Sequence, residues 1–341
     1  DPDEPLPPPG LVGEHGAVGI AEGGTQPVDG LRADPAQIRG SIAPLVTPFT
    51  ASGEVDHDGL RALVRWQLAA GSHGISLGGS TGEPSAQSID ERAEAIRTVA
   101  DEVGDRVPFV PGTGSAKLAE TLELTAAARD AGADAALVIT PYYARPTQEA
   151  LYVWYSTVAR EFPDLPIVAY NVPSRTAVEI APETVGRLFR DHDNFVGVKE
   201  TTKDFEHFSR VLHAAGPDLL VWSGIELLCL PILSLGGVGF VSALANIAPA
   251  AVAQMYEAAV AGDAERAREI HYGVHPLVDL LFVETNPAPA KWLLMQRGLL
   301  DSDHVRSPLV PLTASGQAKV RALAAAGEQY LTPTVLPEVT A

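Results

Sequence analysis

The sequence predicts an α/β protein, a (β/α)8 TIM barrel with a C-terminal helical appendage. Between Ser41 and Ala243, eight short apolar runs occur, and a longer amphipathic stretch follows each of the first seven. Short strands that alternate with helices are typical of a parallel sheet. Eight such units within about 200 residues favour a closed barrel over an open doubly wound sheet, which is the alternative. No GxGxxG motif follows the first run, which weakens that alternative.

The predicted units follow one another in a regular order. The strands are expected at residues 41–47, 73–79, 107–113, 134–140, 166–172, 194–200, 219–224 and 238–243. The helices that follow the first seven strands are expected at residues 57–71, 90–104, 118–132, 147–162, 181–192, 204–216 and 225–237. Gly71, Gly132 and Gly216 stand where a glycine commonly ends a helix, which supports these boundaries.

The two ends of the chain differ from this repeating part. Residues 1–39 are rich in Pro and Gly and lack hydrophobic periodicity, so we interpret them as a flexible N-terminal tail. Residues 40–246 are assigned to the barrel that carries the active site. Further helices are expected near 248–262, 264–281, 287–298 and 313–328, too many for one barrel unit. We therefore assign residues 247–330 to a C-terminal helical domain and 331–341 to a tail.

The composition provides a large core and an acidic surface. Of 341 residues, 46% are hydrophobic and 20% are charged, which is enough for a barrel of about 250 residues. The 24 basic and 43 acidic residues give a net charge of −19, which repels nucleic acids and anionic membranes. No apolar run reaches the roughly 20 residues that span a bilayer. We therefore expect neither a nucleic-acid partner nor a membrane partner.

The chain has a single cysteine and no recognisable secretory signal. Cys229 lies in an apolar stretch and cannot form an internal disulfide. A small buried thiol in a reducing compartment is the expected state, and we predict a cytoplasmic location.

The most informative candidate is Lys199, which ends the sixth predicted strand. Active groups of a TIM barrel lie at the C-terminal ends of the strands. An amine in a dry barrel mouth has a lowered pKa, so its neutral form can attack a ketone and form a Schiff base. The structural alternative is a lysine that extends from the strand end to water.

Polar residues after neighbouring strands could serve the same chemistry. Tyr170 ends the fifth strand and could move protons at the imine, and Tyr143 could extend a chain of hydroxyls. Ser80 and Thr81 follow the second strand and could hold a carboxylate. Arg175 could bind a carboxylate through two parallel hydrogen bonds. Taken singly, each has an ordinary alternative as a core aromatic, a turn residue or a surface ion pair.

Other motifs are weaker. GTGSAK at 112–117 lacks the ending of a phosphate loop, and the sequence has neither HExxH nor GxSxG. His271 and His275 lie one turn apart near Glu284, but in the C-terminal helices, where packing is the expected role. No metal site is expected.

The segments GGSTGE, TPYYARPTQE, YNVPSRT, GVKE, SGIE and FVETNPAPAKW occur in this order. Together they resemble the dihydrodipicolinate synthase / N-acetylneuraminate lyase family of class I aldolases, from about Ser41 to Leu323. The resemblance implies a barrel with a C-terminal helical domain, usually a homotetramer built from two tight dimers. It also implies that no cofactor is needed, because pyruvate forms a covalent imine with Lys199.

The resemblance assigns roles to the remaining candidates. It implies that Tyr170 is the proton shuttle and that Tyr143 completes a relay across the tight-dimer interface. Ser80 bridges the relay, Thr81 holds the pyruvate carboxylate with it, and Gly224 lies beside the bound pyruvate. Two further substrate-binding residues are implied, Arg175 and Val241.

Arg175 indicates the synthase branch, whose members condense pyruvate with aspartate 4-semialdehyde in lysine biosynthesis. One alternative is another pyruvate-dependent aldolase, acting on a 2-keto-3-deoxy sugar acid, hydroxy-oxoglutarate or N-acetylneuraminate. A second alternative is a non-catalytic binding protein on an aldolase scaffold, for which loss of Lys199 or Tyr170 would be expected, and neither is lost.

The sequence also departs from the family pattern. Ser80 replaces the usual Thr, which keeps the hydroxyl but loses the methyl group that restricts its rotamer. Regulated synthases of the family have a site for feedback inhibition by lysine. In this sequence only Glu120 and Tyr142 of that site are retained, and the other matching positions hold Ile89, Arg92 and Ala116. We therefore expect weak or absent inhibition by lysine.

Overall fold

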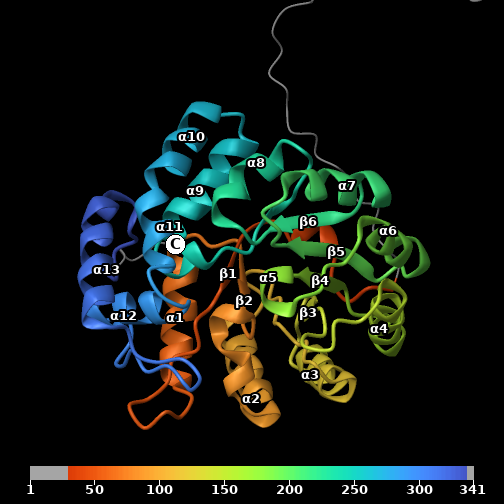
Figure 1. Cartoon of the computed structure of the whole chain (residues 1–341), viewed down its shortest axis with the longest axis horizontal. Helices are drawn as coiled ribbons and strands as arrows, with labels where there is room; N and C mark the ends of the chain where they lie inside the picture. Colours follow the sequence, from red (N-terminus) through yellow and green to blue (C-terminus); the bar gives the residue numbers. More distant parts are fainter. Residues whose placement is uncertain (1–29, 336–341) are drawn as a thin grey trace, which may run out of the picture.

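The computed structural model describes residues 30–335, in which seven parallel strands form one curled sheet surrounded by helices (Figure 1). The order of the strands in the sheet is β2-β1-β7-β6-β5-β4-β3. They are β1 Gly40–Pro44, β2 Gly74–Ser76, β3 Ala136–Ile139, β4 Ile167–Asn171, β5 Phe195–Glu200, β6 Leu220–Ser223 and β7 Gly239–Phe240. The predicted barrel fold is confirmed.

One of the eight predicted strands is not a continuous strand. Residues 107–113 join the two ends of the sheet through isolated bridges, Ile75 to Phe109 and Gly112 to Leu137. The Leu137 N–H donates to the carbonyl of Pro111 at 2.9 Å. Pro111 itself has no N–H to donate to β3, so a full ladder of hydrogen bonds cannot form. The segment still closes the barrel between β2 and β3.

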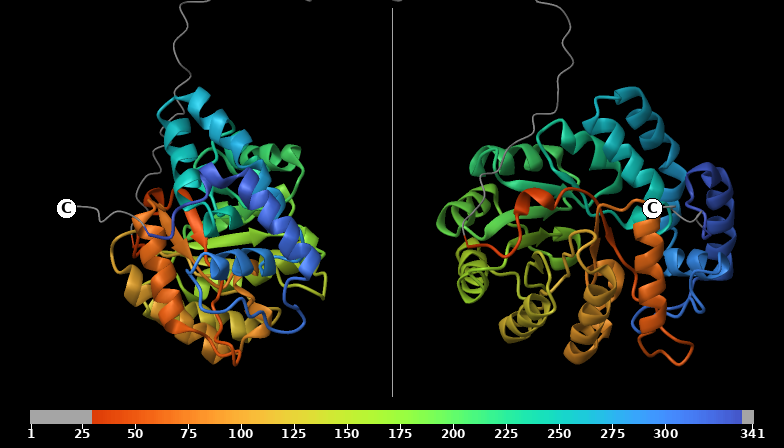
Figure 2. Two further views of the ribbon diagram at one scale, coloured as in Figure 1. Left: turned by 90° about the vertical axis from the view of Figure 1, so that its left-hand side faces the viewer. Right: turned by 180° about the vertical axis from the view of Figure 1, so that it is seen from behind.

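An outer ring of helices covers the sheet (Figure 2). One of these helices follows each of the first seven predicted strands. These helices are α1 His57–Ala69, α2 Ile89–Val103, α3 Leu118–Asp130, α4 Gln148–Glu161, α6 Pro182–Asp191, α7 Phe205–Ala215 and α8 Cys229–Leu233. The short helix α5, Pro173–Thr176, follows β4. Local signals in the sequence set the starts, such as the capping box formed by Ser88 and Glu91 at α2.

The C-terminal helices lie together on one side of the barrel (Figure 1). They are α9 Pro249–Val260, α10 Ala264–Gly273, α11 His275–Leu281, α12 Ala288–Gln296 and α13 Ala314–Ala326. The single helix predicted at 264–281 is wrong, because the chain forms two helices there. Pro276 lies in the first turn of α11 and cannot continue the hydrogen bonds of α10.

Part of the predicted N-terminal tail belongs to the folded body. Pro35–Gln37 form a 3-10 turn, and Ile38 is 1% exposed among the apolar side chains inside the barrel. At the other end, the Trp66 Nε1–H donates to the carbonyl of Pro333 at 2.8 Å. The interpretation of residues 1–29 and 336–341 as tails lies outside the described residues.

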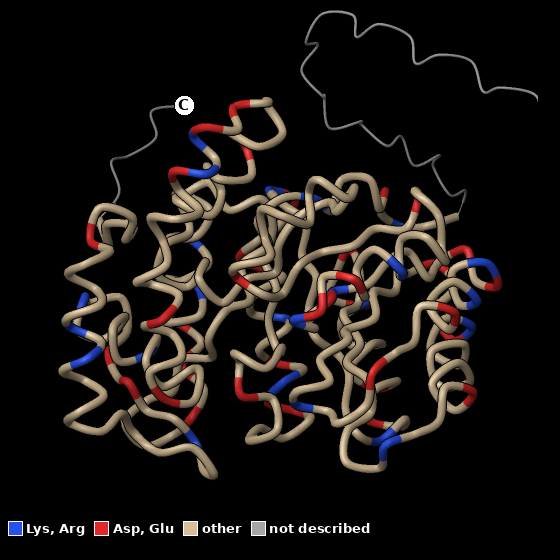
Figure 3. Tube along the Cα trace, turned by 45° about the horizontal axis from the view of Figure 1, so that its top comes forward, with Lys and Arg blue, Asp and Glu red and all other residues tan. Residues whose placement is uncertain are grey.

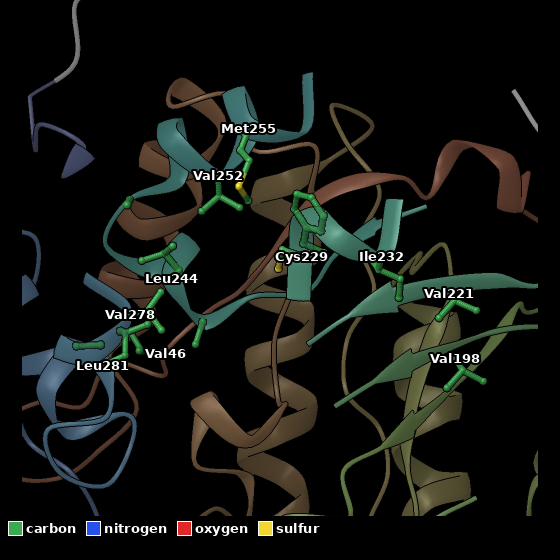
Figure 4. Packing of buried hydrophobic residues seen from close by; sticks show 14 of the residues in the cluster. Val46, Val198, Val221, Cys229, Ile232, Leu244, Val252, Met255, Val278 and Leu281 are labelled. Carbon is green, nitrogen blue, oxygen red and sulfur yellow. The ribbon is translucent and has the colours of Figure 1, made fainter. Parts of the chain in front are cut away.

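The main core fills the space between the sheet and the outer helices. Val198 and Val221 of the sheet face Ile232 of α8, and Val252 and Met255 of α9 belong to the same cluster (Figure 4). The thiol of Cys229 is buried in this layer, and burial raises its pKa well above the usual range. Charged residues of both signs lie over the surrounding helices (Figure 3). None of the helices within residues 30–335 is both long and apolar enough to cross a bilayer.

Candidate active site

The alternation of side chains along β4 and β5 directs Tyr170 and Lys199 into the barrel. These two residues are paired across the parallel strands, and Lys199 is paired with Trp222 on its other side. Lys199 is only 5% exposed, and its Nζ lies 4.2 Å from the centre of the Tyr170 ring. The amine is therefore held against the phenol in a largely dry barrel mouth.

A cavity of about 630 Å³ opens around Lys199, within the size range of small-molecule sites. It brings together seven of the eight predicted site residues: Ser80, Thr81, Tyr170, Arg175, Lys199, Gly224 and Val241. These residues come from loops and strand ends that are far apart in the sequence. The parallel order of the strands places all of them at one end of the barrel.

Tyr143 is the exception, because it does not line this cavity. Its side chain is 95% exposed, and its backbone has a positive φ of 73°. Within one chain, Tyr143 therefore cannot extend the hydroxyls of the site. A contribution to the site of a second subunit stays a prediction.

The hydroxyl residues stand in a tight turn after β2. Ser80 Oγ lies 3.4 Å from the hydroxyl of Tyr170, which is long for a hydrogen bond but close enough to tighten when substrate binds. Ser80 to Gly82 form a 3-10 turn that ends at Glu83 in the left-handed region, with φ 55°. This turn directs both hydroxyls toward the cavity.

Gly224 leaves no room for a side chain. A Cβ atom at this position would overlap the methyl group of Thr201 and lie 2.6 Å from Cε of Lys199. Glycine is therefore required here so that the Lys199 side chain can lie extended in the barrel mouth.

Behind the barrel wall, buried polar side chains join the ends of β4 and β5. Glu200 accepts hydrogen bonds from Nδ2 of Asn171 at 2.9 and 3.0 Å and from the N–H groups of Thr201 and Thr202. Nε2 of His207 lies 3.1 Å from the same carboxylate. Burial opposes a charge on His207, but Glu200 raises its pKa overall. Residues adjacent to Tyr170 and Lys199 are thus firmly held.

The cavity also carries ionisable side chains that sequence reasoning missed. Lys203, Glu226 and Asp279 line it together with Arg175; of these, Glu226 is buried and the others are exposed. Burial raises the pKa of Glu226. Glu226 belongs to the quoted SGIE segment and could have been chosen from its position after a strand. Asp279 comes from α11 in the C-terminal helices. It could not have been found from the rule that active groups lie at the C-terminal ends of barrel strands.

The turn that carries the hydroxyls is also tied to the C-terminal segment. Nδ2 of Asn286 donates to Oγ1 of Thr81 at 3.0 Å, and Nζ of Lys291 lies 2.8 Å from Oε1 of Glu83. Both contacts join GGSTGE to FVETNPAPAKW across about 200 residues of sequence. The sequence had singled out both segments but had not indicated that they touch.

Together these groups can bind a small keto acid and activate it. A lysine amine lies beside a phenol and two hydroxyls, and basic groups at the outer part can hold carboxylates. Residues 30–335 contain no cluster of three or more His, Cys, Asp or Glu residues that could hold a metal ion.

Comparison with known proteins gives consistent matches over most of the chain. Residues 37–326 match the dihydrodipicolinate synthetase family. A 4-hydroxy-tetrahydrodipicolinate synthase of Thermus thermophilus is 49% identical over 286 residues, which cover 84% of this chain and 95% of that protein.

Solved structures of similar proteins share the fold. The crystal structure of dihydrodipicolinate synthase from Aquifex aeolicus has a TM-score of 0.83 and 37% identity, covering 86% of this chain and 100% of that one. A dihydrodipicolinate synthase of Acinetobacter baumannii in complex with pyruvate has a TM-score of 0.82 and 37% identity, covering 85% and 99%.

Proposed function

This chain belongs to the dihydrodipicolinate synthetase family, and we propose that it catalyses the reaction of a 4-hydroxy-tetrahydrodipicolinate synthase. In this reaction a lyase of the class I aldolase type condenses pyruvate with aspartate 4-semialdehyde, a step of lysine biosynthesis. The observation that carries the proposal is the buried amine of Lys199, which lies in a cavity beside Tyr170, Ser80 and Thr81. The pyruvate complex of the Acinetobacter relative supports pyruvate as the first substrate.

The first half of the reaction forms an imine. The neutral amine of Lys199 attacks C2 of pyruvate, and the carbonyl oxygen leaves as water after proton transfers through Tyr170 and Ser80. The protonated imine then withdraws electrons from C2. A methyl proton is lost to a base, which leaves a nucleophilic enamine on Lys199.

The second half forms the new carbon–carbon bond. The enamine carbon attacks the aldehyde carbon of the second substrate, and the aldehyde oxygen takes up a proton. The amino group of the bound product then displaces Lys199 from C2, which closes the ring and regenerates the free amine. Arg175, at the outer part of the cavity, is suited to hold the carboxylate of the aldehyde substrate.

Two alternatives are less well supported. Another pyruvate-dependent aldolase would share Lys199 and Tyr170, but Arg175 in the cavity favours an aldehyde that carries a carboxylate. A non-catalytic scaffold would have no need for the buried amine of Lys199 against the Tyr170 ring.

The proposal includes a homotetramer made of two tight dimers, in which Tyr143 enters the site of the neighbouring subunit. Its side chain, 95% exposed in the connection between β3 and α4, supports this assembly, because a large aromatic side chain gains stability when it is buried. The proposal also includes a cytoplasmic location, which suits the buried free thiol of Cys229. The covalent imine on Lys199 requires no additional cofactor.

Borohydride reduction in the presence of pyruvate tests this chemistry. Peptide mass spectrometry should find a reduced pyruvate adduct on Lys199 and none in Lys199→Ala. An aldehyde panel led by aspartate 4-semialdehyde then identifies the second substrate. If the folded protein forms no adduct while a known aldolase is labelled in parallel, both enzymatic functions, the synthase and another pyruvate-dependent aldolase, are excluded.

A further inference from the structure

The carboxamide of Asn286 contacts the substrate cavity from the C-terminal segment. Asn286 lines the same cavity as Thr81 and Lys199, and its side chain is 7% exposed. Its Nδ2 donates to Oγ1 of Thr81 at 3.0 Å, and its Oδ1 has no partner within residues 30–335. The only hydrogen bond of this carboxamide in that part of the chain is therefore made to a residue of the site.

The hydrogen bond between Asn286 and Thr81 fixes which of the two groups is the donor. An amide nitrogen can only donate, so Oγ1 of Thr81 must act as the acceptor. The hydroxyl proton of Thr81 is not used in this contact and can point elsewhere. Because the cavity is the open space next to Thr81, the proton is free to be donated into it.

The turn that carries Thr81 is held firmly, so the orientation of the Thr81 hydroxyl can be maintained. Glu83, two residues later, is bound by Lys291 of α12 at 2.8 Å, and Lys291 is fully buried. The other carboxylate oxygen of Glu83, Oε2, accepts a hydrogen bond from the backbone N–H of Arg306 at 2.9 Å. The C-terminal segment thus fixes the turn at two points, Thr81 and Glu83.

We propose that Asn286 is a positioning residue that orients the Thr81 hydroxyl as a hydrogen-bond donor to the carboxylate of pyruvate. The inference rests on the proposed function, because it requires pyruvate beside Lys199. A carboxylate accepts hydrogen bonds and offers no proton, so the site gains from a hydroxyl whose lone pair is already engaged. The opposite arrangement would present oxygen lone pairs to an anion.

The variant Asn286→Asp reverses the direction of the contact. An ionised carboxylate only accepts, so Thr81 would have to donate to it and could no longer donate to pyruvate. We expect the pyruvate concentration that gives half-maximal trapped adduct on Lys199 to rise roughly 10- to 100-fold, the worth of one hydrogen bond to a charged group. Thr81→Val, which lacks the hydroxyl, should show a rise of similar size.

A double-mutant cycle separates this effect from simple charge repulsion. In the Thr81→Val background, Asn286→Asp should cause no further rise, because the hydroxyl it redirects is absent. Asn194→Asp is the matched control. Asn194 is also buried and donates only to backbone carbonyls, at the start of β5 and outside the cavity. Asn194→Asp should leave the pyruvate concentration for half-maximal adduct unchanged, even if the variant protein is less stable.

Several outcomes would overturn the inference. Asn286→Asp with normal pyruvate binding would show that the amide does not direct the hydroxyl. An equal rise in both backgrounds would show repulsion by the new charge alone. Unchanged pyruvate binding by Thr81→Val would refute the role of the hydroxyl even if Asn286→Asp does not fold. Absence of an adduct in the unmodified protein would instead refute the proposed function itself, and the inference with it.

Discussion

The ammonium group of Lys291 lies 2.8 Å from Oε1 of Glu83, with side-chain exposures of 0% and 2%. Burial lowers the pKa of Lys291, and the charge and hydrogen bond of Glu83 oppose this change. The ion pair joins α12 to the turn that carries the hydroxyls of the site. The C-terminal helices are therefore part of the support of the cavity, in addition to covering one side of the barrel.

Replacing Lys291 with Met should strongly destabilise the protein, because Glu83 would be left as a buried and uncompensated charge. We expect the free energy of unfolding to fall by about 3–5 kcal/mol. Urea denaturation measures this change. Adding Glu83→Gln to the same chain should recover part of the loss. Lys319→Met, on the exposed face of α13, is the control and should change little; an equal loss in both would contradict the prediction.

Replacing Gly224 with Ala should slow imine formation. The new methyl group would overlap Thr201 and press on Cε of Lys199, which moves the amine from its place beside Tyr170. A displacement of about 1 Å lowers such rates roughly 100-fold. Rapid quenching with borohydride gives the rate of adduct formation. Gly262→Ala is the control. Alanine is strained there by a positive φ of 81°, but no atom lies within 4 Å of the new methyl group, so the rate of adduct formation should stay normal.

The stability of the protein in acid should depend on Arg306. Its guanidinium binds Glu91 through two hydrogen bonds, of 2.6 and 3.0 Å, and these lower the pKa of Glu91 from 4.5 to about 2. A lowered carboxyl pKa contributes stability above pH 4.5, and that stability is lost as the pH falls toward 2.

Arg306→Gln should therefore be less stable at neutral pH and should lose stability less steeply between pH 4.5 and 2. Thermal unfolding midpoints across this range test the prediction. Glu91→Gln should flatten the same interval. Parallel curves for the variant and the unmodified protein would show that this ion pair does not contribute to the acid response.

Lysine should not inhibit the enzyme appreciably. Arg92 and Tyr142 line a cavity of about 190 Å³ that adjoins the site through Ser80. Burial lowers the pKa of Arg92 to about 10, so its guanidinium remains a cation at neutral pH and repels the ammonium groups of lysine. Initial rates with and without millimolar lysine test this, with a lysine-sensitive relative measured in parallel. Comparable inhibition of both enzymes would contradict the prediction.

The order of strands and helices could be predicted because it depends on local patterns. Apolar runs, capping residues and terminal glycines act within a few residues of one another. Two errors had local causes that the pattern did not reveal. Pro111 prevents a regular third strand, and Pro276 divides one expected helix into two. Ile38 was assigned to a tail because no local pattern shows that the barrel interior accepts its side chain.

For the site, local sequence patterns were enough to predict which side chains stand at the ends of the strands. Lys199, Tyr170 and Arg175 follow from that rule, because parallel strands bring their C-terminal ends to one side of a sheet. The distant groups that support these side chains could be identified only from the folded chain. Asn286 reaches Thr81 and Lys291 reaches Glu83 only after the barrel closes and the C-terminal helices pack on its side. Contacts across about 200 residues depend on the relative placement of whole elements, and no local pattern encodes that placement.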